Sequence, residues 1–220
     1  MFAGYKDLLE QESGGLPRVL PGFESINRYW DTKNDIFAAK IMPGEYYVSI
    51  HGEMIVTVLG SCISACVRDT ESGIGGMNHF MLPDIREVNL KRWENTPVSI
   101  ETRYGNVAME RLINVIIANG GKRKNLEVKL FGGGKVLDMS TDIGGKNIEF
   151  VKHYLDTEML DIAAIDVGGI YPRKVLYYPL SGRVRMKKLI RLHNDTLLNR
   201  EKKYIDNLKH ETYEGKVDIF

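Results

Sequence analysis

Between residues 54 and 82 the apolar, partly β-branched residues gather in three short runs, and glycine-containing polar segments separate them. The runs and their breaks are, in chain order, Met54–Leu59, Gly60-Ser61, Ile63–Val67, Asp69–Gly73 and Ile74–Leu82. Short apolar runs bounded by turn residues are typical of β-strands. This stretch therefore predicts three consecutive strands joined by tight turns.

Further along the chain the apolar positions twice take up helical spacing. Ala108, Leu112, Val115 and Ile116 form one stripe, which predicts a helix over residues 106–118. A second stripe predicts a helix over residues 147–160. Five more strands are expected at residues 44–50, 126–131, 161–167, 173–178 and 183–189, the last two as a hairpin.

Three segments lack a clear period. Residues 1–43 are punctuated by glycine and proline and are expected to form an N-terminal extension, and residues 84–103 are expected to form a surface loop. Residues 192–220 are polar and are expected to form a helical C-terminal extension, with Asp195 as a helix cap. The order of elements in residues 44–191 predicts an α+β domain, a mixed β-sandwich with flanking helices.

Composition narrows the function classes. Thirty basic and twenty-nine acidic residues leave a net charge of +1, so charge gives no indication of nucleic-acid or anionic-membrane binding. No apolar run approaches the roughly 18–20 residues that span a bilayer, and the N-terminus lacks the pattern of a signal peptide. Two cysteines in 220 residues suit a reducing compartment. We expect a soluble, cytoplasmic protein that does not insert into membranes.

The candidate chemistry lies in the three-strand region. Cys62 directly follows the Gly60-Ser61 break, and His79 lies in the third run. Side chains paired across neighbouring strands lie roughly 5 Å apart, so this histidine is expected within reach of the thiol. A cysteine beside an imidazole is the minimum required for a cysteine nucleophile.

Other interpretations of the cysteines need to be weighed. Free cysteine is usually inert packing, and this interpretation is adopted for Cys66 in the middle of a strand. A metal or redox site made of Cys62, Cys66 and His79 is the alternative. Residues four apart on a strand are roughly 13 Å apart, too far to share a zinc ion or form a disulfide. A helical segment would remove this objection.

Two further patterns have ordinary explanations. Gly132–Lys135 follows a predicted strand but lacks the spacing of a phosphate-binding loop, so turn geometry or backbone clearance is expected. The basic residues of 183–191 alternate with apolar ones, as on the wet face of an edge strand. A weak electrostatic docking role for them stays open.

More specific motifs run through most of residues 44–190. They are Leu59–Cys62, Gly75–Pro83, Arg103–Gly105, Phe131–Gly133, Ile143-Gly144 with Asn147, Gly168-Gly169 and Ser181–Val184. Cys62 and His79 are separated by 17 positions (79 − 62). With these motifs in this order, the chain resembles the CheD family of chemoreceptor glutamine deamidases.

This resemblance implies a fold akin to the catalytic domain of the cytotoxic necrotizing factor toxins, with residues 44–191 as the deamidase domain. It implies a catalytic site of Cys62, His79 and Thr57 that hydrolyses glutamine side chains of methyl-accepting chemotaxis receptors, with no metal or organic cofactor. It also implies a CheC-type phosphatase as a second partner. The alternative function is a non-catalytic binding module that regulates such a phosphatase or another chemotaxis protein.

Overall fold

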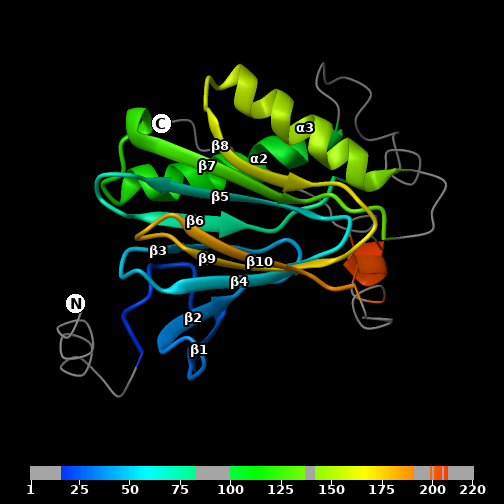
Figure 1. Ribbon diagram of the computed structural model, residues 1–220. Coiled ribbons are helices and arrows are strands. Elements are labelled where there is room, and N and C mark those ends of the chain that lie inside the picture. The colour runs from blue at the N-terminus through cyan, green and yellow to red at the C-terminus, as the bar shows by residue number, and fades with distance from the viewer. Residues whose placement is uncertain are drawn as a thin grey trace.

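The computed structural model describes residues 16–82, 100–136 and 142–190, and residues 199–207 apart from 200 and 205. Two five-stranded sheets form most of this structure (Figure 1). The first sheet contains, in spatial order, β1 (Asn27–Asp31), β2 (Ile36–Lys40), β4 (Met54–Leu59), β9 (Arg173–Tyr178) and β10 (Arg183–Lys188). The second contains β3 (Tyr46–Ser49), β6 (Gly75–Asn78), β5 (Ile63–Asp69), β7 (Leu126–Gly132) and β8 (Ile162–Val167).

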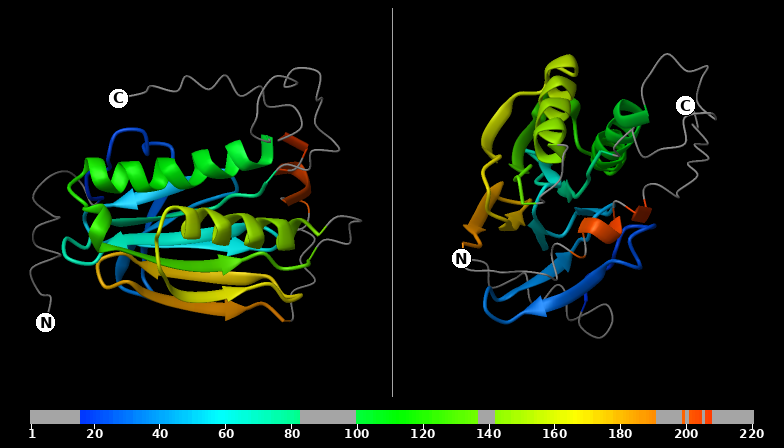
Figure 2. Two further views of the ribbon diagram at one scale, coloured as in Figure 1. Left: turned by 90° about the horizontal axis from the view of Figure 1, so that it is seen from above. Right: turned by 90° about the vertical axis from the view of Figure 1, so that its right-hand side faces the viewer.

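Both sheets are mixed. The pairs β2–β4 and β7–β8 are parallel, and the other pairs are antiparallel. Helices α2 (Ile100–Ala118) and α3 (Ile143–Thr157) lie on the outer face of the second sheet (Figure 2). A short 3-10 helix, Arg123–Asn125, leads into β7. The predicted α+β class, with two mixed sheets, is confirmed.

The layering explains the sequence pattern of the central strands. Every residue of Ile63–Val67 is buried, because helices cover one face of the second sheet and the first sheet covers the other. Strand β4 instead alternates. Ile55 and Leu59 enter the main core, whereas Val56 joins a smaller cluster on the outer face of the first sheet.

The predicted helices begin earlier than their apolar stripes. Helix α2 starts at Ile100, so the prediction of a loop was wrong for residues 100–103, while residues 83–99 lie outside the described part. Helix α3 starts at Ile143, where the Asp142 side chain caps it by accepting from Gly145 N (3.0 Å). Asp195, the expected cap further on, also lies outside the described residues.

The predicted extensions contribute structure of their own. Strands β1 and β2, which the sequence pattern did not predict, pair with each other, and β2 pairs with β4. The described residues between 199 and 207 are helical. Within the described ranges, no helix has the length and apolar character needed to cross a bilayer.

Candidate active site

The turn Gly60–Cys62 joins β4 to β5, and the protein fixes all three of its carbonyl groups. The donors are Gly134 N to Gly60 O (2.7 Å), Asn147 Nδ2 to Ser61 O (2.8 Å) and Gly133 N to Cys62 O (2.7 Å). Because each carbonyl group accepts a hydrogen bond, the peptide groups of the turn have a fixed orientation. The turn that carries Cys62 is therefore preorganised by two other segments of the chain.

The glycine run after β7 is needed for this approach. Gly132 has φ +116°, and a Cβ atom there would lie 2.2 Å from the Cys62 carbonyl oxygen. Gly133, with φ +64°, also occupies a conformation that favours glycine. Turn geometry and close backbone approach thus account for this run, as the sequence predicted.

Asn147 links the turn to the segment that follows His79. Its side chain is fully buried; Nδ2 donates to Ser61 O, and Oδ1 accepts from Leu82 N (both 2.8 Å). One side chain therefore links the Cys62 turn to the segment that follows His79.

The Asn147→Ala substitution is expected to lower the free energy of unfolding by about 2–4 kcal/mol, because it leaves two buried backbone groups unsatisfied. Urea denaturation measures this loss. Asn119→Ala is the matched control, since Asn119 is an exposed asparagine just after α2 whose side chain donates to the Val115 carbonyl. A loss no larger for Asn147→Ala than for the control would contradict the role assigned to this side chain.

Thr57 and His79 meet between the two sheets. Thr57 has the same strand parity as Ile55 and Leu59 and so faces the second sheet. Its Oγ1 lies 2.8 Å from His79 Nδ1 and 2.8 Å from the carbonyl oxygen of Ile41. A hydroxyl group has one proton, and the carbonyl can only accept it. Oγ1 therefore accepts from Nδ1–H, and the neutral ring keeps its lone pair on Nε2.

Cys62 lies on the same face of the second sheet as His79. Ile63 and Phe80 form a bonded antiparallel pair (N···O 2.9 and 3.0 Å), and the pair Cys66–Met77 continues this register. In this register His79 is opposite Ser64 and diagonal to Cys62. Diagonal neighbours have Cα atoms about 7–8 Å apart, within reach of a long side chain. The register thus places Cys62 and His79 on one face of the second sheet, and Thr57 of the first sheet contacts His79.

The thiol of Cys62 is fully buried, and a carboxylate lies beside it. Glu201, from the C-terminal helix, lies beside the thiol and is itself fully buried. Burial raises the pKa of the Cys62 thiol well above its ordinary value, and the Glu201 carboxylate raises it further. Both effects disfavour the thiolate.

The same carboxylate occupies an anion site on the turn. Oε1 accepts from Gly60 N (2.9 Å), and Oε2 accepts from Ser61 N (3.1 Å) and Ser61 Oγ (2.8 Å). Donors that converge in a buried place are suited to stabilise a negatively charged oxygen. Glu201 could not be predicted from the sequence, because one glutamate in a polar extension has no local feature that distinguishes it from its neighbours.

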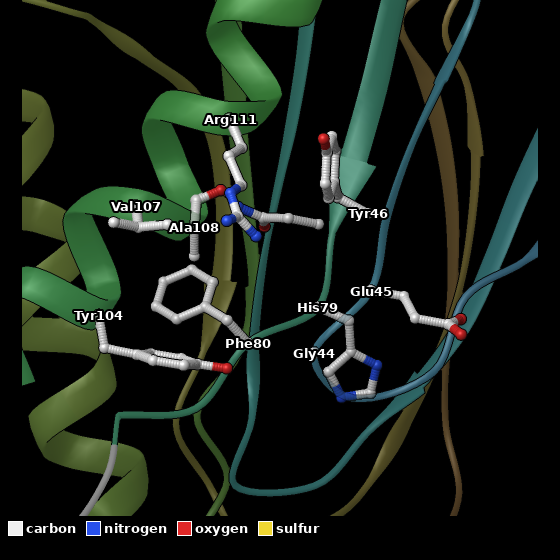
Figure 3. A pocket seen from close by; sticks show the side chains of 10 residues that line it. Gly44, Glu45, Tyr46, His79, Phe80, Tyr104, Val107, Ala108 and Arg111 are labelled. Atoms are coloured by element: carbon white, nitrogen blue, oxygen red, sulfur yellow. The ribbon is translucent and has the colours of Figure 1, made fainter. Parts of the chain in front are cut away.

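A small pocket lies beside the strand that carries His79, between β3 and α2 (Figure 3). Tyr104, Val107, Ala108 and Arg111 of α2 form one side of it. The His79 ring lies on the Glu45 side of the strand, and its backbone is fixed by Gly44 N to His79 O (2.8 Å) and His79 N to Glu45 O (2.9 Å). The pocket thus borders the backbone of His79 and a helix face.

Cys66 is a second buried free cysteine, in the middle of β5. Burial raises the pKa of its thiol. Because the segment is a strand, Cys62 and Cys66 are too far apart to share a metal ion or to form a disulfide. Its position agrees with a packing role.

Together the fold and the site define an α+β protein with a cysteine and a histidine on one face of a sheet and a threonine of the other sheet in contact with the histidine. The family model described as "CheD chemotactic sensory transduction" matches residues 81–188. A relative from Halorhodospira halophila, named "Probable chemoreceptor glutamine deamidase CheD", is 57% identical over 93% of this chain and 94% of its own length. Relatives with the same name occur in Hahella chejuensis (54%; 93% and 95%) and Saccharophagus degradans (46%; 98% and 99%). The chain belongs to the CheD family.

Proposed function

We propose that this protein is a chemoreceptor glutamine deamidase, a protein-glutamine glutaminase in which Cys62 is the nucleophile, His79 the base and Thr57 the residue that orients the imidazole. The observation that carries the proposal is the Thr57–His79 hydrogen bond, which leaves Nε2 basic on the sheet face shared with Cys62. The names of the relatives, which cover nearly the whole chain, support the same activity.

The reaction takes two steps. His79 Nε2 takes the proton of the Cys62 thiol, and the thiolate attacks the carboxamide carbon of a glutamine side chain. Backbone amides of the Gly60–Cys62 turn stabilise the tetrahedral oxyanion, at about 3–4 kcal/mol for each well-placed donor. The imidazolium protonates the departing ammonia, which leaves a thioester. His79 then activates water, and the thioester is hydrolysed to glutamate.

The substrates are glutamine residues on the helical cytoplasmic part of methyl-accepting chemotaxis receptors, and the protein acts in the cytoplasm. The deamidase domain spans residues 44–191 and shares its architecture with the catalytic domain of the cytotoxic necrotizing factor toxins. Residues 1–43 and 192–220 extend it, and β1 and β2 from the first of these add to its first sheet. A CheC-type phosphatase is a further proposed partner.

Incubation of the purified protein with a receptor cytoplasmic fragment tests this function. We expect ammonia release and conversion of specific receptor glutamines to glutamate, each a mass gain of about 1 Da that peptide mapping locates. If fragments of several receptors are tested and none of their glutamines changes, the result contradicts the proposal.

Thr57→Val is expected to lower kcat/KM by about 10- to 100-fold, because valine keeps the shape but removes the acceptor that fixes the imidazole. Thr57→Ser keeps the hydroxyl and is expected to retain most activity. Thr157→Val, at an exposed position of α3, is the control. Deamidation rates on the receptor fragment measure the series, and equal rates for the valine and serine variants would argue against a role for the hydroxyl.

A further inference from the structure

The C-terminal helix reaches the candidate active site at the ends of the two sheets, where Figure 1 shows it in orange-red. Tyr204, one turn after Glu201, packs against Gly44, where a Cβ atom would lie 3.0 Å from its ring. The Tyr204 hydroxyl also contacts the hydroxyl of Tyr104. Gly44 itself donates to the carbonyl of His79. The helix thus contacts the Cys62 turn at one residue and the neighbourhood of His79 at the next turn.

The fit around Glu201 is specific. Gly60 has no side chain, and a Cβ atom there would lie 2.4 Å from Oε1 of Glu201. Any other residue at position 60 would displace the carboxylate from the two amides. A glycine that lets a ligand approach the backbone is a common feature of binding turns. The turn therefore presents donors that match the two oxygen atoms of a carboxylate.

The chemical identity of the group matters. The product of glutamine deamidation is a glutamate side chain, and the residue found on the turn is a glutamate presented by a helix. Its carboxylate is hydrogen-bonded to the two residues that precede Cys62 and lies beside the thiol, as the product of that thiol's reaction would. The proposed substrates, too, present their side chains from helices.

We infer that Glu201 is an internal product analogue, and that the C-terminal helix closes the substrate site until a receptor helix replaces it. This inference rests on the proposed deamidase function. The closed state is inactive for two reasons. Glu201 occupies the amides that a substrate oxygen needs, and its negative charge opposes ionisation of Cys62. A receptor side chain enters from a helix seated where residues 201–204 now lie.

The substitution Glu201→Gln in the full chain tests the inference directly, because it turns the product analogue into a substrate analogue. The Cys62 thiolate forms an Sγ–Cδ bond with the new carboxamide, the C–N bond breaks and ammonia leaves with a proton. Water then hydrolyses the thioester. We expect most molecules to convert to glutamate at position 201, with a mass gain of about 1 Da that peptide mapping assigns to that residue. The double variant Cys62→Ala/Glu201→Gln is expected to keep its glutamine.

Wild-type activity on the receptor fragment, measured in parallel, separates the two proposals. If the wild type deamidates the receptor but the glutamine at position 201 of the variant stays unchanged, the product-analogue inference alone is overturned. Conversion at position 201 without receptor activity would support the inference and overturn the choice of receptors as substrates. Failure of both reactions would overturn both.

A second variant gives a readout without substrate. In Glu201→Ala the thiol loses its carboxylate neighbour, and each unit by which its pKa falls gives tenfold more thiolate at neutral pH. We expect alkylation of Cys62 by iodoacetamide at pH 7 to become at least about tenfold faster than in wild type. Lys202→Ala, at the next and exposed position of the helix, is the matched control. An alkylation rate unchanged by Glu201→Ala would overturn the inference.

Discussion

Cys62→Ala is expected to abolish deamidation of receptor glutamines, with a loss of at least about 10³–10⁴-fold in ammonia release. Alanine keeps the backbone of the turn and its three fixed carbonyl groups, so the anion site persists while the nucleophile is lost. No other cysteine can replace it, because the only other one, Cys66, lies further along β5. Mass mapping of the receptor fragment and ammonia assays give two independent measurements.

Cys66→Ala is the matched control for this experiment. It removes a buried thiol from β5, the strand that follows the Cys62 turn, and is expected to cost about 1 kcal/mol of stability while receptor deamidation continues. Full activity in Cys62→Ala would refute the cysteine-dependent mechanism. If Cys62→Ala loses activity but cells that carry it keep normal chemotaxis, the binding-module alternative would account better for the biological role.

The central strands could be predicted from the sequence because their signals are local. Each apolar run between Met54 and Leu82 is bounded by turn residues. The structure places β4 and β6 within their runs, and β5 begins at Ile63 as predicted but continues to Asp69. The predicted helix began at residue 106, after Gly105, whereas α2 begins at Ile100. The structure shows instead that Gly105 lies inside the helix, where a Cβ atom would be 2.3 Å from the ring of Phe150 on α3. Helix crossing, a tertiary constraint, explains that glycine.

Contacts between distant segments could not be predicted. Strand β2 pairs in parallel with β4, and no pattern within residues 36–40 indicates which strand will lie beside them. The Thr57–His79 hydrogen bond joins two different sheets, so only the resemblance to a family indicated Thr57. Glu201 reaches Gly60 across 141 positions, and neither spacing nor the family motifs pointed to it.

His79→Gln is expected to lower kcat/KM by about 10³-fold or more, because glutamine supplies polar atoms of similar reach but no group that takes and returns a proton. In the wild type, Thr57 holds the imidazole in the tautomer that leaves Nε2 basic, and that nitrogen serves both the thiol and the departing ammonia. The same receptor fragment and mass mapping measure the loss.

His153→Gln is the control for this substitution, since His153 is an exposed histidine on α3. The urea midpoint shows whether the His79→Gln protein is folded. If the folded variant deamidates the receptor as fast as the His153→Gln control, the imidazole is dispensable. In that case the Thr57–His79 pair would act only as packing between the two sheets. A different outcome is that His79→Gln loses activity, while the double variant His79→Gln/Glu201→Ala keeps fast alkylation of Cys62. The histidine would then act mainly by protonating the leaving ammonia.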